Sequence, residues 1–375
     1  MMKRNSLKVA LVTDSLFKMA GSSKVLECFA EIYPEADIFT LFSLSGKRRE
    51  KVLSKSIYDH KIINSSLNKI PFIEKFYRYT LPRWPFVIEK FDFSEYDLVI
   101  SSSWAISHGI ITPLNTKHIS YIHTPMRYIW DMYYTYFGKK KFKWIYSFAS
   151  HLLRIWDSSA SSRADLMISN SNFVSERMHK YWRRKADYVL YPPISKYKGE
   201  IYEEREDYFV SGAPYESNKG GELLLESAKW LGFRLKILGD GAMRRSLERK
   251  YSDCKNIEFL GWVGEDDKFS IMSKASGYII TGIEDFGIFP VEAMSCGTPV
   301  LGYRSGGVVE SIQENVNGMF FNEQSIEDFK RVFDKFSKKI WDHKKVSESV
   351  VRFNDKEGFK KDFEGIVNSF YEEKG

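Results

Sequence analysis

The sequence predicts an α/β protein made of two doubly wound domains, each built around a parallel β-sheet. Short apolar runs alternate with segments of helical periodicity along the whole chain. The alternation stops at Tyr191-Pro192-Pro193 and then restarts, and the two halves carry opposite net charge. With 375 residues, each domain is long enough to bury a full hydrophobic core.

The first half opens with an apolar run at residues 8–13, which predicts a buried strand. After the turn Gly21-Ser22-Ser23, apolar residues recur at helical spacing from Val25 to Pro34 and predict a helix. Three more apolar runs predict strands at 97–101, 118–122 and 165–169. A predicted helix at 174–182 follows the last of them. Such uninterrupted runs are typical of parallel sheets covered on both faces.

The pattern restarts after a polar stretch that ends at Asp207. The predicted strands of the second half are 208–211, 233–238, 256–260, 278–281 and 299–303, and the predicted helices are 221–230, 267–275, 287–296 and the tail from 325 onward. Ligands of doubly wound sheets bind beyond the carboxyl ends of the strands. The residues that directly follow strands are therefore expected to carry the function.

The composition is that of a globular protein, with 43% hydrophobic and 28% charged residues. It excludes a disordered, collagen-like or disulfide-stapled chain. The three cysteines lie far apart without metal-ligand spacing, which favours a reducing compartment. Residues 98–116 lack Asp, Glu, Lys and Arg but hold several polar side chains, so we expect no transmembrane helix there. The apolar run at residues 9–12 is too short for a signal peptide, and we expect a cytoplasmic protein.

Charge is divided unevenly along the chain. Residues 1–198 hold 31 Lys and Arg against 17 Asp and Glu, a net charge of +14, whereas residues 199–375 hold 25 against 32, a net charge of −7. Basic-aromatic clusters at 139–144, 83–86 and 182–185 predict contact with an anionic membrane surface, and the alternative is a solvated face with inward-packed aromatic rings. No nucleic-acid-binding motif accompanies the charge, so nucleic acid is not an expected partner.

One segment carries two carboxylates at a predicted strand-to-helix junction. It reads Glu284-Asp285-Phe286-Gly287-Ile288-Phe289-Pro290-Val291-Glu292. Free N–H groups at a helix start bind anions or hydroxyl oxygens, and Gly287 permits close approach of a ligand. Each carboxylate could hold a pair of sugar hydroxyls; the alternative is that both are first-turn acids favoured by the helix dipole.

This segment resembles the signature of retaining glycosyltransferase family 4, in which two glutamates are separated by seven residues. The resemblance extends over almost the whole chain. The segment 293–300 and the pair Gly306-Gly307 are similar to the rest of that signature. A branch that includes bacterial O-antigen mannosyltransferases is similar in the segments 101–103, 121–131, 154–157, 170–172 and 191–193.

The resemblance implies a GT-B fold, with two facing Rossmann-like domains and a C-terminal helix that crosses back to the first. The expected divisions are an acceptor-binding domain at 1–194, a linker at 195–206, a nucleotide-sugar-binding domain at 207–355 and the tail helix at 356–375.

The resemblance also implies roles for individual residues in donor binding. Glu284 would hold donor sugar hydroxyls, Glu292 the nucleotide ribose, and Lys219 the donor diphosphate. The amides of Phe286, Gly287 and Ile288 would line the sugar, and Gly21 of the first loop would approach the phosphates.

In the first domain, the resemblance places His123 at the donor sugar near the reacting carbon. A histidine at a strand end can donate a hydrogen bond at neutral pH, and the alternative is a structural histidine. Arg127 and Asp131 of the same run are expected to bind the acceptor or to support the site.

The chain departs from the family pattern in two places. An Arg usually stands five residues before the diphosphate Lys, but no Arg occurs between Val210 and Lys219; Arg244 or Arg304 is a candidate substitute. The first loop has Ser23 where an acidic acceptor contact is usual.

The sequence contains no Asp-x-Asp pair, so the expected chemistry is independent of metal and cofactor, with a nucleotide sugar as substrate. We expect a hexose, mannose from GDP-mannose, to be transferred to a lipid-linked saccharide on the inner face of the plasma membrane during surface polysaccharide assembly. Three alternatives stay open: a transferase that uses a UDP-sugar, a non-catalytic scaffold with the same fold, and a sugar-nucleotide epimerase.

Overall fold

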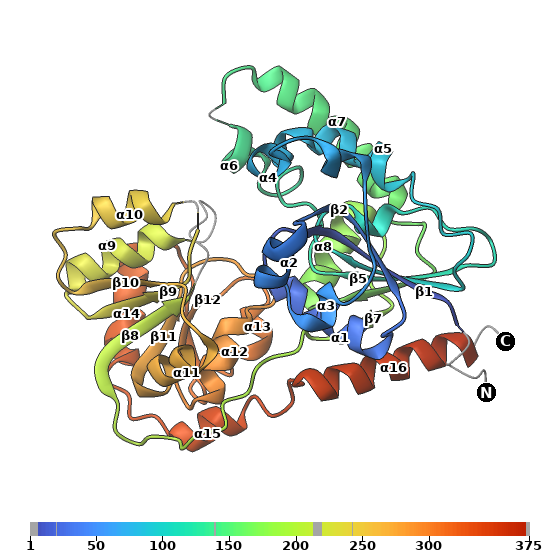
Figure 1. Ribbon diagram of the computed structural model, residues 1–375. Helices are drawn as coiled ribbons and strands as arrows, with labels where there is room; N and C mark the ends of the chain where they lie inside the picture. The colour runs from blue at the N-terminus through green and yellow to red at the C-terminus, as the bar shows by residue number, and fades with distance from the viewer. Residues whose placement is uncertain (1–6, 20, 139, 213–219, 242, 373–375) are drawn as a thin grey trace. The chain divides into compact units, whose positions relative to one another are not determined.

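The computed structural model describes residues 7–19, 21–138, 140–212, 220–241 and 243–372. It divides into two compact units (Figure 1). The N-terminal unit comprises residues 1–193 and 356–375, and the C-terminal unit comprises residues 194–355. Residues 195–206, expected as a linker, group with the C-terminal unit and lead into its first strand. The predicted fold class, two doubly wound parallel-sheet domains, is confirmed.

The N-terminal unit is built on a seven-stranded sheet in the order β3-β2-β1-β4-β5-β6-β7, and all its neighbouring strands pair in parallel. Its strands are β1 (Val9–Leu16), β2 (Asp37–Ser43), β3 (Ile62–Asn64), β4 (Leu98–Ser103), β5 (Lys117–Ile122), β6 (Leu166–Ser169) and β7 (Tyr188–Val189). The sequence analysis missed β2, β3 and β7. β3 and β7 are too short for periodicity to register, and the short apolar run of β2 has no alternation that distinguishes a strand.

The helices of this unit cover the two faces of the sheet (Figure 1). They are α1 (Gly21–Ile32), α2 (Gly46–Val52), α3 (Lys55–Tyr58), η2 (Ser66–Lys69), α4 (Ile73–Phe76), η3 (Tyr77–Arg83), α5 (Trp84–Ile88), η4 (Ser107–Gly109), α6 (Tyr133–Phe137), α7 (Lys143–Ala160), α8 (Asn172–Trp182) and α16 (Lys356–Glu372).

The C-terminal helix α16 belongs to the N-terminal unit although the C-terminal unit precedes it in sequence. Its buried side chains Phe359, Phe363, Val367 and Phe370 join the apolar core beneath α1. The rings of Phe29 and Phe363 lie 4.4 Å apart between centroids, and Glu31 accepts hydrogen bonds from Lys356 and Lys360. The tail is thus an integral layer of the N-terminal unit.

The C-terminal unit has a six-stranded parallel sheet in the order β10-β9-β8-β11-β12-β13. Its strands are β8 (Glu206–Gly212), β9 (Leu235–Leu238), β10 (Ile257–Gly261), β11 (Ala275–Ile280), β12 (Val300–Tyr303) and β13 (Gly318–Phe321). Its helices are α9 (Gly221–Leu231), α10 (Arg244–Lys250), α11 (Glu265–Lys274), α12 (Ile288–Ser295), α13 (Val308–Ser311), α14 (Ile326–Phe336) and α15 (His343–Glu348).

The strand order reverses direction once in each sheet, between β1 and β4 and between β8 and β11. Because the carboxyl ends of parallel strands share one edge, these two reversal points are where doubly wound sheets form ligand crevices. None of the helices that the structure describes has the length and apolar character needed to cross a bilayer.

Candidate active site

The predicted donor segment begins at the carboxyl end of β11, next to the reversal point of the C-terminal sheet. The strand ends at Ile280, a loop carries Glu284, and α12 begins at Ile288. Glu284 is partly exposed, whereas Phe286 is buried with its ring against Phe353 at 5.5 Å. Because the ring of Phe286 is packed inside the unit, this residue can contribute only its backbone groups to a site at the start of α12.

Gly287 is the N-cap of α12 and has a φ of 90°. A side chain is strained at this φ, and a Cβ atom there would lie 2.9 Å from Cγ1 of Val308. The first turn of α12 leaves N–H groups without helical acceptors, and Pro290 occupies a position whose N–H is not needed. This local geometry makes the start of α12 suited to bind an anion or sugar oxygens.

A second loop, which follows β12, closes tightly on the Glu284 loop. Glu284 and Gly306 form a parallel β-bridge, and the Gly307 N–H donates to the Glu284 carbonyl at 2.8 Å. A Cβ on Gly306, whose φ is 86°, would lie 2.5 Å from the Glu284 carbonyl oxygen. The pair Gly306-Gly307, which resembles the family pattern, is required by this close backbone approach.

Glu292, predicted to bind the ribose, is fully buried in α12. Its Oε2 accepts from Lys268 Nζ of α11 at 2.7 Å, and its Oε1 accepts from the Ser195 N–H at 3.2 Å. Lys268 is itself only 7% exposed, and its ammonium lies over the rings of Phe269 and Phe289. The Glu292 carboxylate therefore balances the charge of a buried cation inside the C-terminal unit.

Lys268 is a site residue that sequence reasoning missed. Its only signal was its position in a helix of low amphipathicity just before β11, which does not reveal a pairing across two helices.

Lys219, the predicted diphosphate cation, lies outside the described residues. Its neighbour Gly220 accepts a hydrogen bond from Thr281 Oγ1 at 2.8 Å, directly after β11. The two candidate substitutes for the missing Arg have partners of their own. Arg244 donates to Glu248 at 2.6 Å, and Arg304 donates to Glu314 at 2.6 Å and to Asn322 at 2.8 Å.

In the N-terminal unit, His123 directly follows β5 at the carboxyl edge of the sheet. The residue is 9% exposed, and its Nε2 lies 2.8 Å from Ser102 Oγ of β4. Its backbone N–H donates to the Ser103 carbonyl, and its carbonyl accepts from Asn170 Nδ2 after β6. Three adjacent strand ends thus fix the position of His123.

The run that follows His123 is held by Arg177 of α8, another residue that sequence reasoning missed. Arg177 is 5% exposed and donates to Thr124 Oγ1 at 2.5 Å and to Asp131 Oδ1 at 2.9 Å. Asp131 therefore acts as the partner of a buried guanidinium, while Arg127 is partly exposed with its Nη1 4.0 Å from Met132 Sδ. The available signal was that Arg177 lies three residues after Val174 on the apolar side of a predicted helix.

A second buried group, Asp157 of α7, anchors the end of the same run. Its Oδ2 accepts from the indole N–H groups of Trp130 at 2.7 Å and Trp182 at 2.6 Å. Arg154, one turn earlier, donates to the Ile129 carbonyl. The segments 121–131 and 154–157, which resemble one branch of the family, are therefore parts of one packed unit.

Gly21 is the first residue of α1, so the first predicted loop opens a helix after β1, and Ser23 is buried in that helix. This position lies at the same edge of the sheet as His123, because β1 and β5 run parallel.

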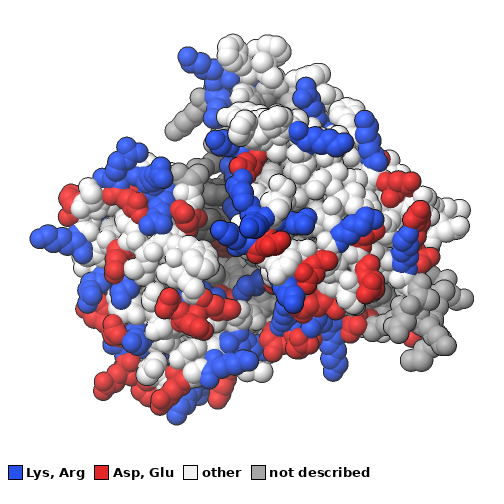
Figure 2. Space-filling model, viewed as in Figure 1, with Lys and Arg blue, Asp and Glu red and all other residues white. Residues whose placement is uncertain are grey.

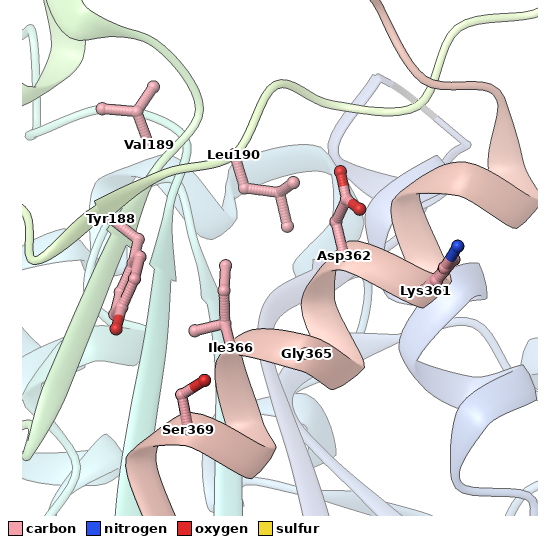
Figure 3. A pocket seen from close by; sticks show the side chains of 8 residues that line it. All are labelled: Tyr188, Val189, Leu190, Lys361, Asp362, Gly365, Ile366 and Ser369. Carbon is pink, nitrogen blue, oxygen red and sulfur yellow. The ribbon is translucent and has the colours of Figure 1, made fainter. Parts of the chain in front are cut away.

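A separate hollow of about 470 Å³ lies where α16 crosses the edge strand β7 (Figure 3). Tyr188, Val189, Leu190, Lys361, Asp362, Gly365, Ile366 and Ser369 line it. None of the predicted site residues is among them. Within the described ranges, no group of three His, Cys, Asp or Glu side chains is placed to hold a metal ion.

Comparison with known proteins agrees with this geometry. Residues 195–349, which make up most of the C-terminal unit, match the family described as Glycosyl transferases group 1. The fold of the whole chain is the GT-B fold. An Anabaena protein, HepE, solved with UDP-glucose, superposes with a TM-score of 0.67 at 15% identity and covers 97% of this chain and 100% of that one. Sucrose-phosphate synthase from Thermosynechococcus elongatus gives a TM-score of 0.68 at 15% identity, with 97% and 99% covered.

The sequence relatives have different activities in their names and are similar to only part of this chain. An uncharacterised glycosyltransferase of Methanocaldococcus jannaschii is 27% identical over 57% of this chain and 61% of its own. Human alpha-1,3/1,6-mannosyltransferase ALG2 is 27% identical over 46% and 50%. The Escherichia coli O-antigen biosynthesis glycosyltransferase WbnH is 34% identical over 22% and 24%. The chain spans about three-fifths of the length of the first two curated relatives it matches.

Proposed function

We propose that the chain is a retaining glycosyltransferase that moves a hexose from a nucleotide sugar to a lipid-linked saccharide in surface polysaccharide assembly. The observation that carries the proposal is the junction at 284–292, where a partly exposed carboxylate, a helix start and a buried carboxylate follow β11 within a domain of the matching family. Mannose from GDP-mannose is the proposed donor, since a human mannosyltransferase is among the relatives. The O-antigen glycosyltransferase among them supports the pathway.

The proposed reaction needs no nucleophile from the protein. The acceptor hydroxyl attacks the anomeric carbon on the face from which the diphosphate leaves, the bond from that carbon to the diphosphate oxygen breaks, and the diphosphate takes the hydroxyl proton. Glu284 and His123 orient the sugar, and Lys219 with the N–H groups at the start of α12 stabilises the charge that develops on the diphosphate.

One variant tests the role of Glu284. Glu284→Ala is expected to lower the turnover of sugar transfer by about a hundredfold or more, because an orienting contact in the transition state is lost. The measurement is product formation by mass spectrometry with a lipid-linked acceptor. Glu258→Ala, which alters an exposed carboxylate on β10, is the matched control and should keep wild-type turnover. Wild-type turnover in Glu284→Ala would remove Glu284 from the site.

The donor is identified by a thermal-shift panel of GDP-, UDP-, dTDP- and ADP-sugars, because a bound donor raises the unfolding temperature by mass action. GDP-mannose is expected to give the largest rise. A rise with UDP-sugars alone would replace the mannose assignment, and UDP complexes of HepE give that alternative its support. No rise with any donor would favour a scaffold, and donor consumed without acceptor would indicate an epimerase.

A further inference from the structure

One side of helix α7 packs on the protein, and the opposite side is apolar and exposed. Its buried residues are Ser150, Leu153, Asp157 and Ala160, which recur at helical spacing on the inner side. Five large apolar residues are exposed on the other side: Trp144 (72%), Ile145 (47%), Phe148 (64%), Leu152 (50%) and Ile155 (55%). At about 100° per residue, these five fall within an arc of about 100° that lies opposite the buried side.

The exposed face continues beyond the helix itself. Phe142, the residue before α7, is 68% exposed. Tyr134 of α6 is 82% exposed, and α6 is held beside the start of α7 by the stacked rings of Phe137 and Tyr146, 4.9 Å apart. Soluble proteins rarely leave a contiguous apolar patch of this kind uncovered unless something binds it.

The charges around this face are of one sign. From Met132 to Trp156 the chain contains no Asp or Glu, but it contains four lysines and one arginine: Lys139, Lys140, Lys141, Lys143 and Arg154. Lys140, Lys141 and Lys143 are exposed. Figure 2 shows blue and uncharged atoms, without red, at the outer end of this unit where α7 begins.

We propose that this face of α7 docks on an anionic phospholipid bilayer. The helix lies parallel to the surface, with Trp144, Phe148 and their neighbours inserted among the acyl chains and the lysines among the headgroups. A second copy of the chain is disfavoured as the occupant, because a two-fold interface brings the same patch against itself and would oppose the lysines. This docking face rests on the proposed function, because a lipid-linked acceptor lies in a membrane. Vesicle binding can nevertheless be measured without donor or acceptor.

The test is flotation of the full-length protein with lipid vesicles. Wild type is expected to float with vesicles that contain phosphatidylglycerol beside phosphatidylcholine and to bind pure phosphatidylcholine more weakly. The double variant Trp144→Ser with Phe148→Ser should lower the partition coefficient at least about tenfold, since two large apolar side chains leave the bilayer. Both residues are exposed, so the unfolding temperature should stay at the wild-type value.

The matched control is Trp230→Ser with Trp262→Ser, which removes two tryptophans that are 63% and 80% exposed on the C-terminal unit. This control should bind vesicles as wild type does. Replacing Lys140, Lys141 and Lys143 by Glu should abolish the preference for anionic vesicles.

Three results would overturn the proposal. The first is no flotation of wild type with anionic vesicles, and the second is equal binding by the Trp144/Phe148 variant and wild type. The third is a wild-type dimer in light scattering that becomes a monomer in this variant, which would assign the face to a second copy.

Discussion

Glu292 is expected to contribute both to the stability of the C-terminal unit and to donor binding. Its carboxylate neutralises Lys268 in a site from which water is nearly excluded, and the ribose role implied by the family would use the same carboxylate. The loss of one partner from such a buried pair leaves an uncompensated charge, which is the costly event, whereas removal of both partners is often tolerated.

Glu292→Ala is therefore expected to lower the free energy of unfolding by about 3–5 kcal/mol, beyond any effect on nucleotide binding. The double variant Glu292→Gln with Lys268→Met should recover most of that loss while donor affinity stays low. Urea denaturation with a calorimetric donor titration separates the two effects. As a control, Asp334→Ala breaks the exposed pair with Lys330 and should cost less than about 1 kcal/mol. A Glu292→Ala protein as stable as wild type would contradict this account of the pair.

Asp157 is expected to make the stability of the N-terminal unit depend on pH. Burial raises the pKa of Asp157 to about 7, although hydrogen bonds from Trp130 and Trp182 oppose the rise. Burial also lowers the pKa of His108 to about 3, so this imidazole, whose Nε2 lies 3.4 Å from Asp157 Oδ1, is neutral at pH 7. A carboxyl that keeps its proton more tightly in the folded state gives stability that is complete below its unfolded pKa of 3.8 and is lost as pH rises through about 7.

Asp157→Asn should remove this dependence, because an amide oxygen can accept from both indoles and its NH₂ can face His108 as a protonated carboxyl does. The unfolding free energies of wild type and Asp157→Asn can be measured by urea denaturation at about pH 4 and about pH 8. Relative to wild type, the variant should be more stable at the higher pH than at the lower pH. A difference that is constant with pH, or that moves the other way, would contradict the assignment.

At the scale of elements, the junction of β11 and α12 was predictable because each local signal agreed with the others. The apolar run before Thr281, the glycine at 287 and the proline at 290 mark a strand, a turn and a first helical turn in order. The two-residue β7 offers no such signal. The partners of Glu292 and Asp131 come from α11 and α8, and a pairing between elements depends on tertiary packing that one sequence does not encode as a local pattern.

The loops that follow β11 and β12 approach so closely at Gly306 that there is no room for a side chain at this position. Gly306→Ala is expected to lower the unfolding free energy by about 2 kcal/mol and to weaken donor binding, because the Cβ meets the Glu284 carbonyl oxygen at a strained φ. Gly365→Ala in α16, where a Cβ meets nothing within 4 Å, should instead be neutral or stabilising by up to about 1 kcal/mol. Thermal unfolding and donor titration of both variants check this, and equal behaviour of the two would refute the packing argument.

At the scale of the whole molecule, the two units repeat one architecture with different charge. Each sheet is parallel and reverses its strand order once, and the predicted site residues that the structure describes follow strand ends in both sheets or lie in the loops and helices that begin there. The basic N-terminal unit carries the exposed apolar face of α7, and the acidic C-terminal unit contains the residues that match the glycosyltransferase family. The sequence could predict this division and the basic-aromatic cluster at 139–144, but it could not show which side of α7 packs on the protein and which side stays exposed.

Hydrogen–deuterium exchange in the presence of a saturating nucleotide sugar tests the central claim most directly. If an activated sugar is held at the start of α12, amides in peptides covering 282–292 and the adjoining loop at 304–307 should exchange more slowly with donor than without it. Unchanged exchange in these peptides, with protection appearing elsewhere in the chain, would contradict the account.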